Sequence, residues 1–489
     1  MTARKNHEGA RAPSALRSLA LGLLASQALW LAGCASAPSA VSSDADRQAA
    51  LKRASVGPLL DVPGVAAATP QQPASAAVAG LPWQDVIQDE GLRQLVSLSL
   101  AYNRDLVQAQ SNVTRAQALL TVSQADRWPT LSALFAANRA PNTATGQQAT
   151  SLQLGVAVSA WELDLFGRVR DQVDVSRSQV RLSRAQEDAT RASLVAAVAA
   201  GYFSYLADAE QCQLLERVAQ GRLPALETAR LRERQGLISK VDLGMVESQW
   251  SAARTQALQA RRQVEQDLNA LRMLVGEQLP QALLAANRLP GQDAVKVPMA
   301  SLDSQQLWQR PDVRQAVAQL DGAQAGLGQA KAAALPRFTL SAQAGGVSGT
   351  LQDLLQRPHL AWTLGVQALM PLFDQGRARA QVDAQQASVQ AAVAQLDKSL
   401  QLGLREVADV LAVQHALEQV EPLVSQQVLA EDARYDLAQR KLAQGLLSEP
   451  DWRDVERSWL NARQTQLQWR AARLQQQVSL VKALGGFQR

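Results

Sequence analysis

Residues 151–168, SLQLGVAVSAWELDLFGR, join a segment with a period of two to a long helical segment. The even-numbered residues from 152 to 158 are apolar and the odd-numbered ones are small or polar, which is typical of a strand with one apolar face. The 67 residues 168–234 are rich in helix formers and contain a single proline, Pro224. We therefore predict a strand that leads into a helix of about 100 Å, at 1.5 Å per residue. A rod of this length has to pack beside others, as a coiled coil or a helical barrel.

This pattern occurs twice in the chain. The segment 235–239, QGLIS, returns as 444–448, QGLLS, at an offset of 209 residues. Upstream the offset is 207, because two residues, Asp374 and Gln375, are inserted before the second Gly-Arg pair. Agreement at many positions in one register indicates an internal duplication of roughly 200 residues.

Each half is expected to contain a helix, two strands, a very long helix, a Gly-Leu turn and a final helix. We predict helices over 90–126, 168–234 and 239–276 in the first half and over 311–335, 376–443 and 448–484 in the second. Strands are predicted near 131–135, 151–161, 338–344 and 361–370, with polar loops at 139–150 and 345–358.

The N-terminus has the form of a processing signal. Residues 1–17 are polar and basic, residues 18–31 are apolar, and the sequence Leu-Ala-Gly-Cys ends at Cys34. This ending resembles the bacterial lipoprotein box, in which the cysteine is lipidated and begins the mature chain; an ordinary signal with a chance cysteine is the alternative. Ala35 after the cysteine then implies sorting to the outer membrane. We expect a lipoprotein signal at 1–33, a flexible tether at 34–80, repeats at 81–279 and 311–489, and a connection at 280–310.

The predicted strands have the length and pattern of an outer-membrane β-barrel. A half-exposed soluble sheet fits each strand equally well, and the secretory signal favours the barrel. Four strands cannot close a barrel, since about eight is the practical minimum. Because an open sheet edge is prohibitive in lipid, several chains must share one barrel if these strands span a membrane.

Composition excludes several other classes of protein. Of the net charge of +5, residues 1–33 contribute four basic and one acidic residue, or +3, which leaves +2 for the rest and no dense basic block for nucleic acid. Two cysteines and three histidines are too few for a disulfide framework or a metal cluster, and no catalytic or cofactor motif is evident. We expect Cys212 to be a packed thiol, His359 to lie in a surface loop and His415 on a helix, and we assign none of them a role.

The strand-to-helix segments resemble the TolC-like outer membrane efflux factors, particularly the lipoprotein branch of the OprM and NodT type. The resemblance also includes Trp83, the segment 103–106 and both Gly-Leu turns, and it runs from about 80 to 484. Its signature residues are Trp161, Asp164, Phe166, Gly167, Arg168, Phe373, Gly376 and Arg377.

The resemblance implies a mainly α fold with a small β part. It implies a homotrimer whose twelve-stranded transmembrane barrel takes four strands from each chain, above a long α-helical barrel. The protein would be the passive outer membrane channel of a tripartite exporter of small molecules, without enzymatic activity or cofactor. Its partners would be a periplasmic adaptor, a proton-driven inner-membrane pump of the RND type and outer membrane lipid. The alternatives are the exit duct of a type I protein secretion system and a lipid-anchored coiled-coil scaffold without a pore.

The two Gly-Leu-x-Ser turns are predicted hairpin tips, with glycine ending one helix and serine capping the next. The resemblance implies that these tips also contact the adaptor. The predicted contact residues are Gly236, Leu237, Ile238, Ser239, Gly445, Leu446, Leu447 and Ser448.

Asp451, Asp454 and Arg457 follow the second tip at helical spacing and share a helix face. A solvated charged face is the simplest interpretation of them. The resemblance implies instead an aperture ring at the periplasmic entrance, in which Asp454 is the constricting carboxylate and Arg457 its neighbour.

Overall fold

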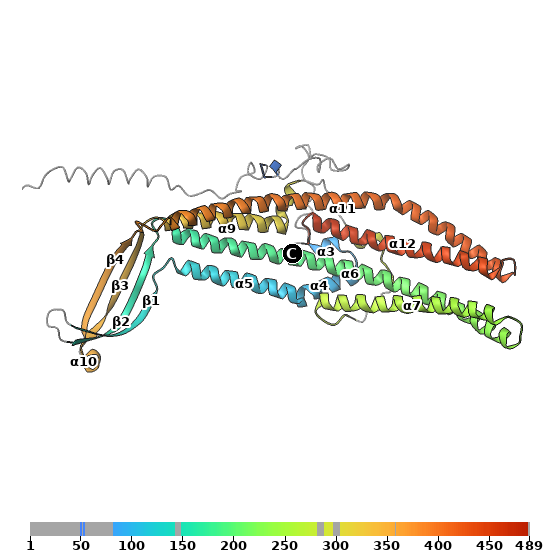
Figure 1. Cartoon of the computed structure of the whole chain (residues 1–489), viewed down its shortest axis with the longest axis horizontal. Coiled ribbons are helices and arrows are strands. Elements are labelled where there is room, and N and C mark those ends of the chain that lie inside the picture. Colours follow the sequence, from blue (N-terminus) through green and yellow to red (C-terminus); the bar gives the residue numbers. More distant parts are fainter. Residues whose placement is uncertain are drawn as a thin grey trace, which may run out of the picture.

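The computed structural model describes residues 49–50, 52–53, 82–141, 148–280, 288–296, 304–356 and 358–487. The predicted signal, the lipidation candidate Cys34 and most of the predicted tether lie outside these residues. The molecule is elongated, with a small sheet at one end and a long bundle of helices (Figure 1).

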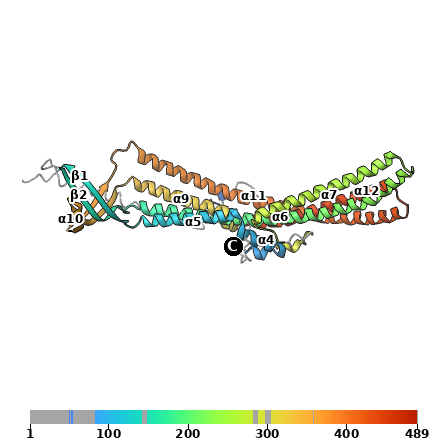
Figure 2. The same ribbon diagram turned by 90° about the horizontal axis from the view of Figure 1, so that it is seen from below.

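Two helices run the whole length of the bundle, from the sheet to the far end (Figure 1). They are α6, Arg168–Arg234, and α11, Arg377–Ala443, each of 67 residues. Helix α6 has its predicted bounds, and α11 begins one residue after the predicted start at 376. The main shorter helices beside them lie either in the half next to the sheet or in the far half (Figures 1 and 2). They are α5 (Arg104–Ala125) and α9 (Pro311–Ala333) near the sheet, and α7 (Lys240–Val275) and α12 (Glu449–Ala483) in the far half.

The helix predicted over 90–126 is wrong in one respect, because it is broken at Asn103 into α4, Glu90–Tyr102, and α5. The Asn103 side chain accepts a hydrogen bond from the Leu106 N–H at 3.0 Å and so caps α5. Its amide also donates to the Leu274 carbonyl, 2.9 Å away near the end of α7. The break therefore forms where the end of α7 docks.

The sheet is antiparallel, in the order β1-β2-β3-β4. Each strand extends past at least one of its predicted ends. The predicted loop 139–150 therefore includes the end of β1 and the start of β2, and the predicted loop 345–358 contains the end of β3 and the short helix α10, Leu351–Gln356. His359, predicted in a loop, is the first residue of β4. The strands are β1 (Leu131–Pro141), β2 (Gln148–Leu163), β3 (Arg337–Ser348) and β4 (His359–Leu369).

Strand register places the predicted apolar residues on one continuous face. Phe135 lies opposite Leu154 and Ala344 lies opposite Trp362, so their side chains point to the same side. A β-bulge between Val158 and Trp161 moves Trp161 opposite Leu340 and keeps it on the apolar face. The simple alternation of the sequence did not reveal this bulge.

The other face of the sheet is polar, and on this face the backbones of β2 and β3 lie close together. Gly155 lies opposite Gly345 on this face. A Cβ atom on Gly155 would lie 2.3 Å from the Ala344 carbonyl oxygen, and one on Gly345 would lie 2.4 Å from that of Leu154. Only glycine permits this approach, which indicates that the sheet curls toward its polar face. The polar face therefore lines the inside of the curve and the apolar face the outside.

The main hydrophobic core lies in the middle of the molecule. The central part of α6 packs there against α4, α7 and α12, with Phe203 and Phe487 fully buried. The helix α3, Trp83–Val86, and an isolated bridge between Ile87 and Val295 complete this region, beside the 3-10 turns Gln292–Ala294 and Ser304–Gln309. Helix α6 is long and apolar enough to cross a membrane, but 61% of its most apolar window is buried in the bundle. We therefore interpret α6 as the core helix of the bundle.

A small part of the predicted tether contacts the bundle. Ala50 is buried in a cluster formed by α9 and α11, which includes Val313 and Leu400. Arg53 lies 3.4 Å from the Asp397 carboxylate of α11.

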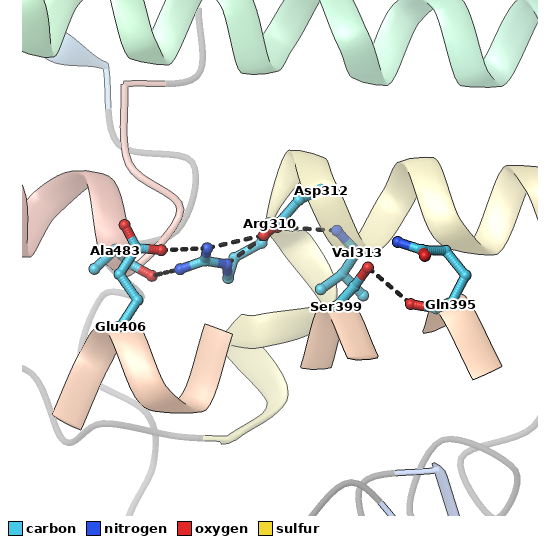
Figure 3. A network of polar contacts seen from close by, with 7 residues as sticks. All are labelled: Arg310, Asp312, Val313, Gln395, Ser399, Glu406 and Ala483. Atoms are coloured by element: carbon cyan, nitrogen blue, oxygen red, sulfur yellow. Dashed lines mark hydrogen bonds and ion pairs between the residues drawn. The ribbon is translucent and has the colours of Figure 1, made fainter. Parts of the chain in front are cut away.

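A buried arginine joins three helices beside the core (Figure 3). The Arg310 guanidinium donates to the carboxylates of Asp312, at 2.9 Å, and Glu406, at 2.6 Å. It also donates to the Ala483 carbonyl at the end of α12. Gly403 makes room for it on α11, since a Cβ there would lie 3.2 Å from the Arg310 Nε. Arg310 therefore fixes the start of α9, the middle of α11 and the end of α12 to one another.

Candidate functional sites

The first predicted tip ends α6 and begins α7. Gly236 has a φ of 72°, and the Leu237 N–H donates to the Arg232 carbonyl at 2.8 Å, as in a Schellman motif. The Ser239 hydroxyl accepts from the Asp242 N–H at 3.1 Å and caps α7.

The second tip has the same construction between α11 and α12. Gly445 has a φ of 72°, and the Leu446 N–H donates to the Lys441 carbonyl at 2.9 Å. The Ser448 hydroxyl accepts from the Asp451 N–H at 3.3 Å and lies 2.5 Å from the Asp451 carboxylate. Asp451, a candidate for the aperture, therefore completes the helix cap.

Both tips present an apolar side chain to solvent. Leu237 is 68% exposed and Leu446 is 70% exposed, while Ile238 and Leu447 are half-buried. The two tips lie together at the end of the bundle farthest from the sheet (Figure 1). Exposed leucines at equivalent positions of the two tips suit a surface that a partner covers.

The other two aperture candidates lie on α12, two turns beyond the tip. Asp454 and Arg457 form an ion pair with each other, and their side chains are 66% and 69% exposed in the single chain. The structure therefore leaves both groups accessible on the surface of the second hairpin.

An ion pair that the sequence did not reveal ties the two hairpins together. Arg222 of α6 donates to the Glu456 carboxylate of α12 at 2.5 Å and to the Gln249 carbonyl of α7 at 3.2 Å. The Glu456 side chain is only 5% exposed. The repeat pairs Glu456 with Glu247, but Glu247 binds Arg230 within its own hairpin, at 2.9 Å. The repeat in the sequence shows that Glu247 and Glu456 are equivalent positions. It does not show that they bind different arginines.

A second cluster holds α12 to α11 just behind this pair. Asp432 accepts from the Trp459 indole at 2.8 Å and from the Arg463 guanidinium at 2.7 Å. The Tyr435 ring stacks on Trp459, with their centroids 4.5 Å apart. These contacts therefore tie α11 to α12 within the second hairpin.

The signature residues form the junction between β2 and α6. The Asp164 carboxylate accepts from the N–H groups of Val169, at 3.1 Å, and Arg170, at 2.8 Å, while Gly167 has a φ of 81°. Arg168 forms two hydrogen bonds of 2.7 Å with Glu162. The rings of Phe166 and Phe338 lie 6.5 Å apart, and Trp161 lies on β2. These residues therefore cap the long helix and fix it to the sheet.

The junction between β4 and α11 uses a different carboxylate. Asp374, one of the two inserted residues, accepts from the N–H groups of Gly376, at 2.9 Å, and Ala378, at 2.8 Å. These hydrogen bonds lower the pKa of the Asp374 carboxyl. Gly376 has a φ of 84° before Arg377, and Phe373 is largely exposed. The insertion therefore supplies its own helix cap.

The described part of the chain contains no cluster of three or more histidine, cysteine or acidic residues that could hold a metal ion. Cys212 is buried on α6, and burial raises the pKa of its thiol. His415 lies on α11, as predicted, and is exposed.

The carboxyl group of Asp208 on α6 is affected by burial and by Asp267 on α7. Burial and a hydrogen bond with Asp267 raise the pKa of Asp208 to about 7. An oxygen of Asp267 is buried and has no other partner in the described ranges, as expected if protonated Asp208 donates to it.

The raised pKa of Asp208 predicts that stability falls as the pH rises. An unfolded aspartate loses its proton near pH 4, whereas this one keeps it to about pH 7 in the folded chain, so folding becomes less favourable between these values. We expect the apparent melting temperature of the purified protein to fall less from pH 5 to pH 8 in Asp208→Asn than in the parent. Asp267→Asn should reduce the pH response only in part, because burial, the largest cause of the raised pKa of Asp208, remains. An unchanged pH response in Asp208→Asn would contradict the raised pKa of Asp208.

The family model of the outer membrane efflux protein matches residues 95–277 and 302–486, that is, both repeats. The probable efflux pump outer membrane protein TtgC of Pseudomonas putida is 31% identical over 424 residues, which are 86% of this chain and 87% of that protein. Outer membrane protein OprJ of Pseudomonas aeruginosa is 31% identical over 427 residues, 84% of this chain and 87% of its own.

Solved structures agree with these relatives. A membrane protein from Pseudomonas aeruginosa has a TM-score of 0.77 and 28% identity, covering 86% of this chain and 98% of its own. The open state of the MtrE outer membrane channel of Neisseria gonorrhoeae has a TM-score of 0.75 and 27% identity, covering 87% of this chain and 96% of its own.

The predicted fold is confirmed: the chain is mainly helical and contributes a four-stranded sheet to the barrel of a trimeric channel. The predicted location in the outer membrane and the function as the outer membrane channel of a tripartite efflux system are also confirmed. Such a channel works with an adaptor and an inner-membrane pump, and its family is one of channels rather than enzymes. The chain belongs to the outer membrane efflux protein family.

Proposed function

We propose that this channel exports small organic molecules, such as antibiotics and solvents, delivered by a proton-driven inner-membrane pump of the RND type. The names of related proteins support this proposal. Proteins 31% identical over most of the chain are named for the efflux of antibiotics, toluene and solvents in Pseudomonas putida. The duct itself supplies no evident energy source, so the pump and the adaptor select and drive the cargo.

Deletion of the gene in its own host tests this function. We expect higher intracellular accumulation of toluene and of a fluorescent dye, with recovery when the gene is returned on a plasmid. Unchanged accumulation together with the loss of a protein from the culture medium would indicate a type I secretion duct instead.

Cys34 is the proposed lipid anchor, on the strength of the Leu-Ala-Gly-Cys sequence that ends there. Mass spectrometry of the mature N-terminus tests this assignment. A mature chain that begins at a residue other than Cys34 would contradict it.

The proposed adaptor contact is made by the two tips, which end in the exposed leucines Leu237 and Leu446. We expect the double variant Gly236→Val, Gly445→Val to form a correctly inserted channel that no longer supports export. The reason is that a β-branched residue resists the positive φ of 72° that both turns require. The measurement is dye efflux in cells with matched amounts of channel.

Gly244 provides a matched control, because it lies near the first tip inside α7 and a Cβ there meets nothing within 4 Å. Gly244→Val should therefore export normally. Asparagine, which tolerates positive φ, should preserve export at Gly236 and Gly445. Normal export by the double valine variant would show that the adaptor docks elsewhere.

Asp454 and Arg457 are the proposed aperture residues, since three chains would bring three copies of this pair toward one axis. Carboxylates that converge in a narrow throat repel one another and attract cations, and a neighbouring arginine offsets this repulsion. We expect Asp454→Ala with Arg457→Ala to raise single-channel conductance in planar bilayers and to weaken cation preference. Asp451→Ala should have a smaller effect on conductance, because Asp451 serves the cap of α12.

The pair Arg405 and Asp409 on α11 is a control of equal charge and similar exposure away from the tips. The double alanine variant of this pair should leave conductance unchanged. If the Asp454 and Arg457 variant also matches the parent in conductance and ion selectivity, these residues form an ordinary solvated face.

A further inference from the structure

The short helix α10 packs on the apolar face of the sheet. Gly346 of β3 lies opposite Leu154 and Leu360, so all three point to that face. A Cβ atom on Gly346 would lie 2.6 Å from the Pro358 Cβ and 3.5 Å from the Leu354 Cδ1. Leu354 is the buried residue of α10. Helix α10 is therefore outside the curve of the sheet, at the end farthest from the helices (Figure 1).

The sides of α10 that do not pack on the sheet differ in polarity, so the helix is amphipathic. Leu351 and Leu355 are four residues apart, so they share one side of the helix, and they are 56% and 69% exposed. Gln352 and Gln356 occupy the side opposite Leu354 and are also exposed. Two large apolar side chains are thus presented beside a surface that is itself apolar.

An aromatic side chain on β4 indicates where α10 lies relative to the boundary of the membrane. Trp362 is 72% exposed on the apolar face, two residues from Leu360 in the direction of the helical bundle. Two residues of a strand span about 7 Å. Exposed tryptophans on transmembrane barrels gather at the boundary between acyl chains and head groups. Helix α10 therefore lies at the outer rim of the apolar band.

A neighbouring chain is a poor candidate to cover these leucines. Helix α10 packs chiefly over β2 and β3, the two central strands of the sheet. Neighbouring chains have to pair with the open edges, β1 and β4, to close the barrel. The apolar face over the central strands is the surface that faces lipid.

We propose that α10 is an interfacial helix that inserts Leu351 and Leu355 among the acyl chains of the outer leaflet. The helix widens the lipid-facing surface at the rim of the barrel and fixes the depth of the barrel in the membrane. Its glutamines stay at head-group level, as the polar side of an interfacial helix does. This role is separate from export, because α10 is remote from the tips and from the aperture residues.

Spin labels on α10 test the proposal in the full-length protein, reconstituted in vesicles of phosphatidylethanolamine and phosphatidylglycerol. Leu355→Cys carries the test label, and Gln352→Cys carries a label on the polar side of the same helix. Leu364→Cys on β4 gives the lipid-exposed reference, and Leu237→Cys at the tip gives the aqueous one. The parent protein, whose Cys212 is buried, gives the background of labelling. Collision rates with oxygen and with a water-soluble nickel complex are then measured for each label.

We expect the label at 355 to collide with oxygen as often as the label at 364 and to be protected from the nickel complex, while the label at 352 remains accessible to nickel. Equal nickel access at 355 and 352 would overturn the proposal, since α10 would then lie in water. Low access of both reagents at 355 would also overturn it, because protein would then cover this side of α10. Neither outcome depends on which cargo the channel exports.

Discussion

Replacing Glu456 with alanine should loosen the periplasmic end of the channel and raise its conductance. The Arg222 guanidinium, which is largely buried, would lose its counter-ion and the direct link between the two hairpins. Loss of one partner of a buried ion pair costs about 3–5 kcal/mol. Because Arg222 belongs to the first hairpin and Glu456 to the second, this loss of free energy weakens the contact between the two hairpins. Single-channel recording in planar bilayers measures the effect.

The internal repeat offers a matched control for Glu456. Glu247 occupies the equivalent position of the first repeat, but its pair with Arg230 is exposed and lies within one hairpin. An exposed pair is worth about 0–1 kcal/mol, so Glu247→Ala should leave conductance near that of the parent. Equal conductance in Glu456→Ala and Glu247→Ala would show that the link between hairpins does not restrain the channel.

Replacing Arg310 with methionine should destabilise the middle of the molecule. The variant would keep most of the volume of the side chain but would leave the Ala483 carbonyl without its donor and Asp312 and Glu406 without their shared cation. We expect a loss of about 3 kcal/mol, from one orphaned buried acceptor and the charged hydrogen bonds. The apparent melting temperature of the detergent-solubilised protein reports this loss.

Arg405 provides the comparison for Arg310. It also pairs with a carboxylate and lies on α11, but its side chain is exposed. Arg405→Met should change stability by no more than about 0.5 kcal/mol. If Arg310→Met melts at the same temperature as Arg405→Met, the network in Figure 3 does not hold the three helices together.

The long helices could be predicted from sequence because their ends carry strong local signals. Gly167 and Gly376 at their starts and Gly236 and Gly445 at their ends all adopt positive φ, which only glycine accepts readily. The strands could be predicted because alternation decides which face is apolar, and the register confirms that face.

The features that could not be predicted depend on contacts between distant segments. The break at Asn103 is fixed by the end of α7, 171 residues further along the chain. The bulge before Trp161 is visible only through the pairing of β2 with β3. The link from Arg222 to Glu456 spans 234 residues and joins two repeats that look alike in sequence. Local pattern carries no information on such pairings.

Disulfide cross-linking in membranes can show whether three chains close one barrel through the open edges of their sheets. One cysteine is placed on β1, at Phe135, and a second in turn at each residue of β4 from 360 to 366. Because β1 and β4 are at opposite edges of the sheet of one chain, each disulfide that forms between them must join neighbouring chains. We expect at least one pair to give a covalent trimer and no larger species, while Phe135→Cys alone gives at most dimers. Cross-linked ladders that continue beyond three chains, or a folded monomer with no cross-links at any position, would contradict it.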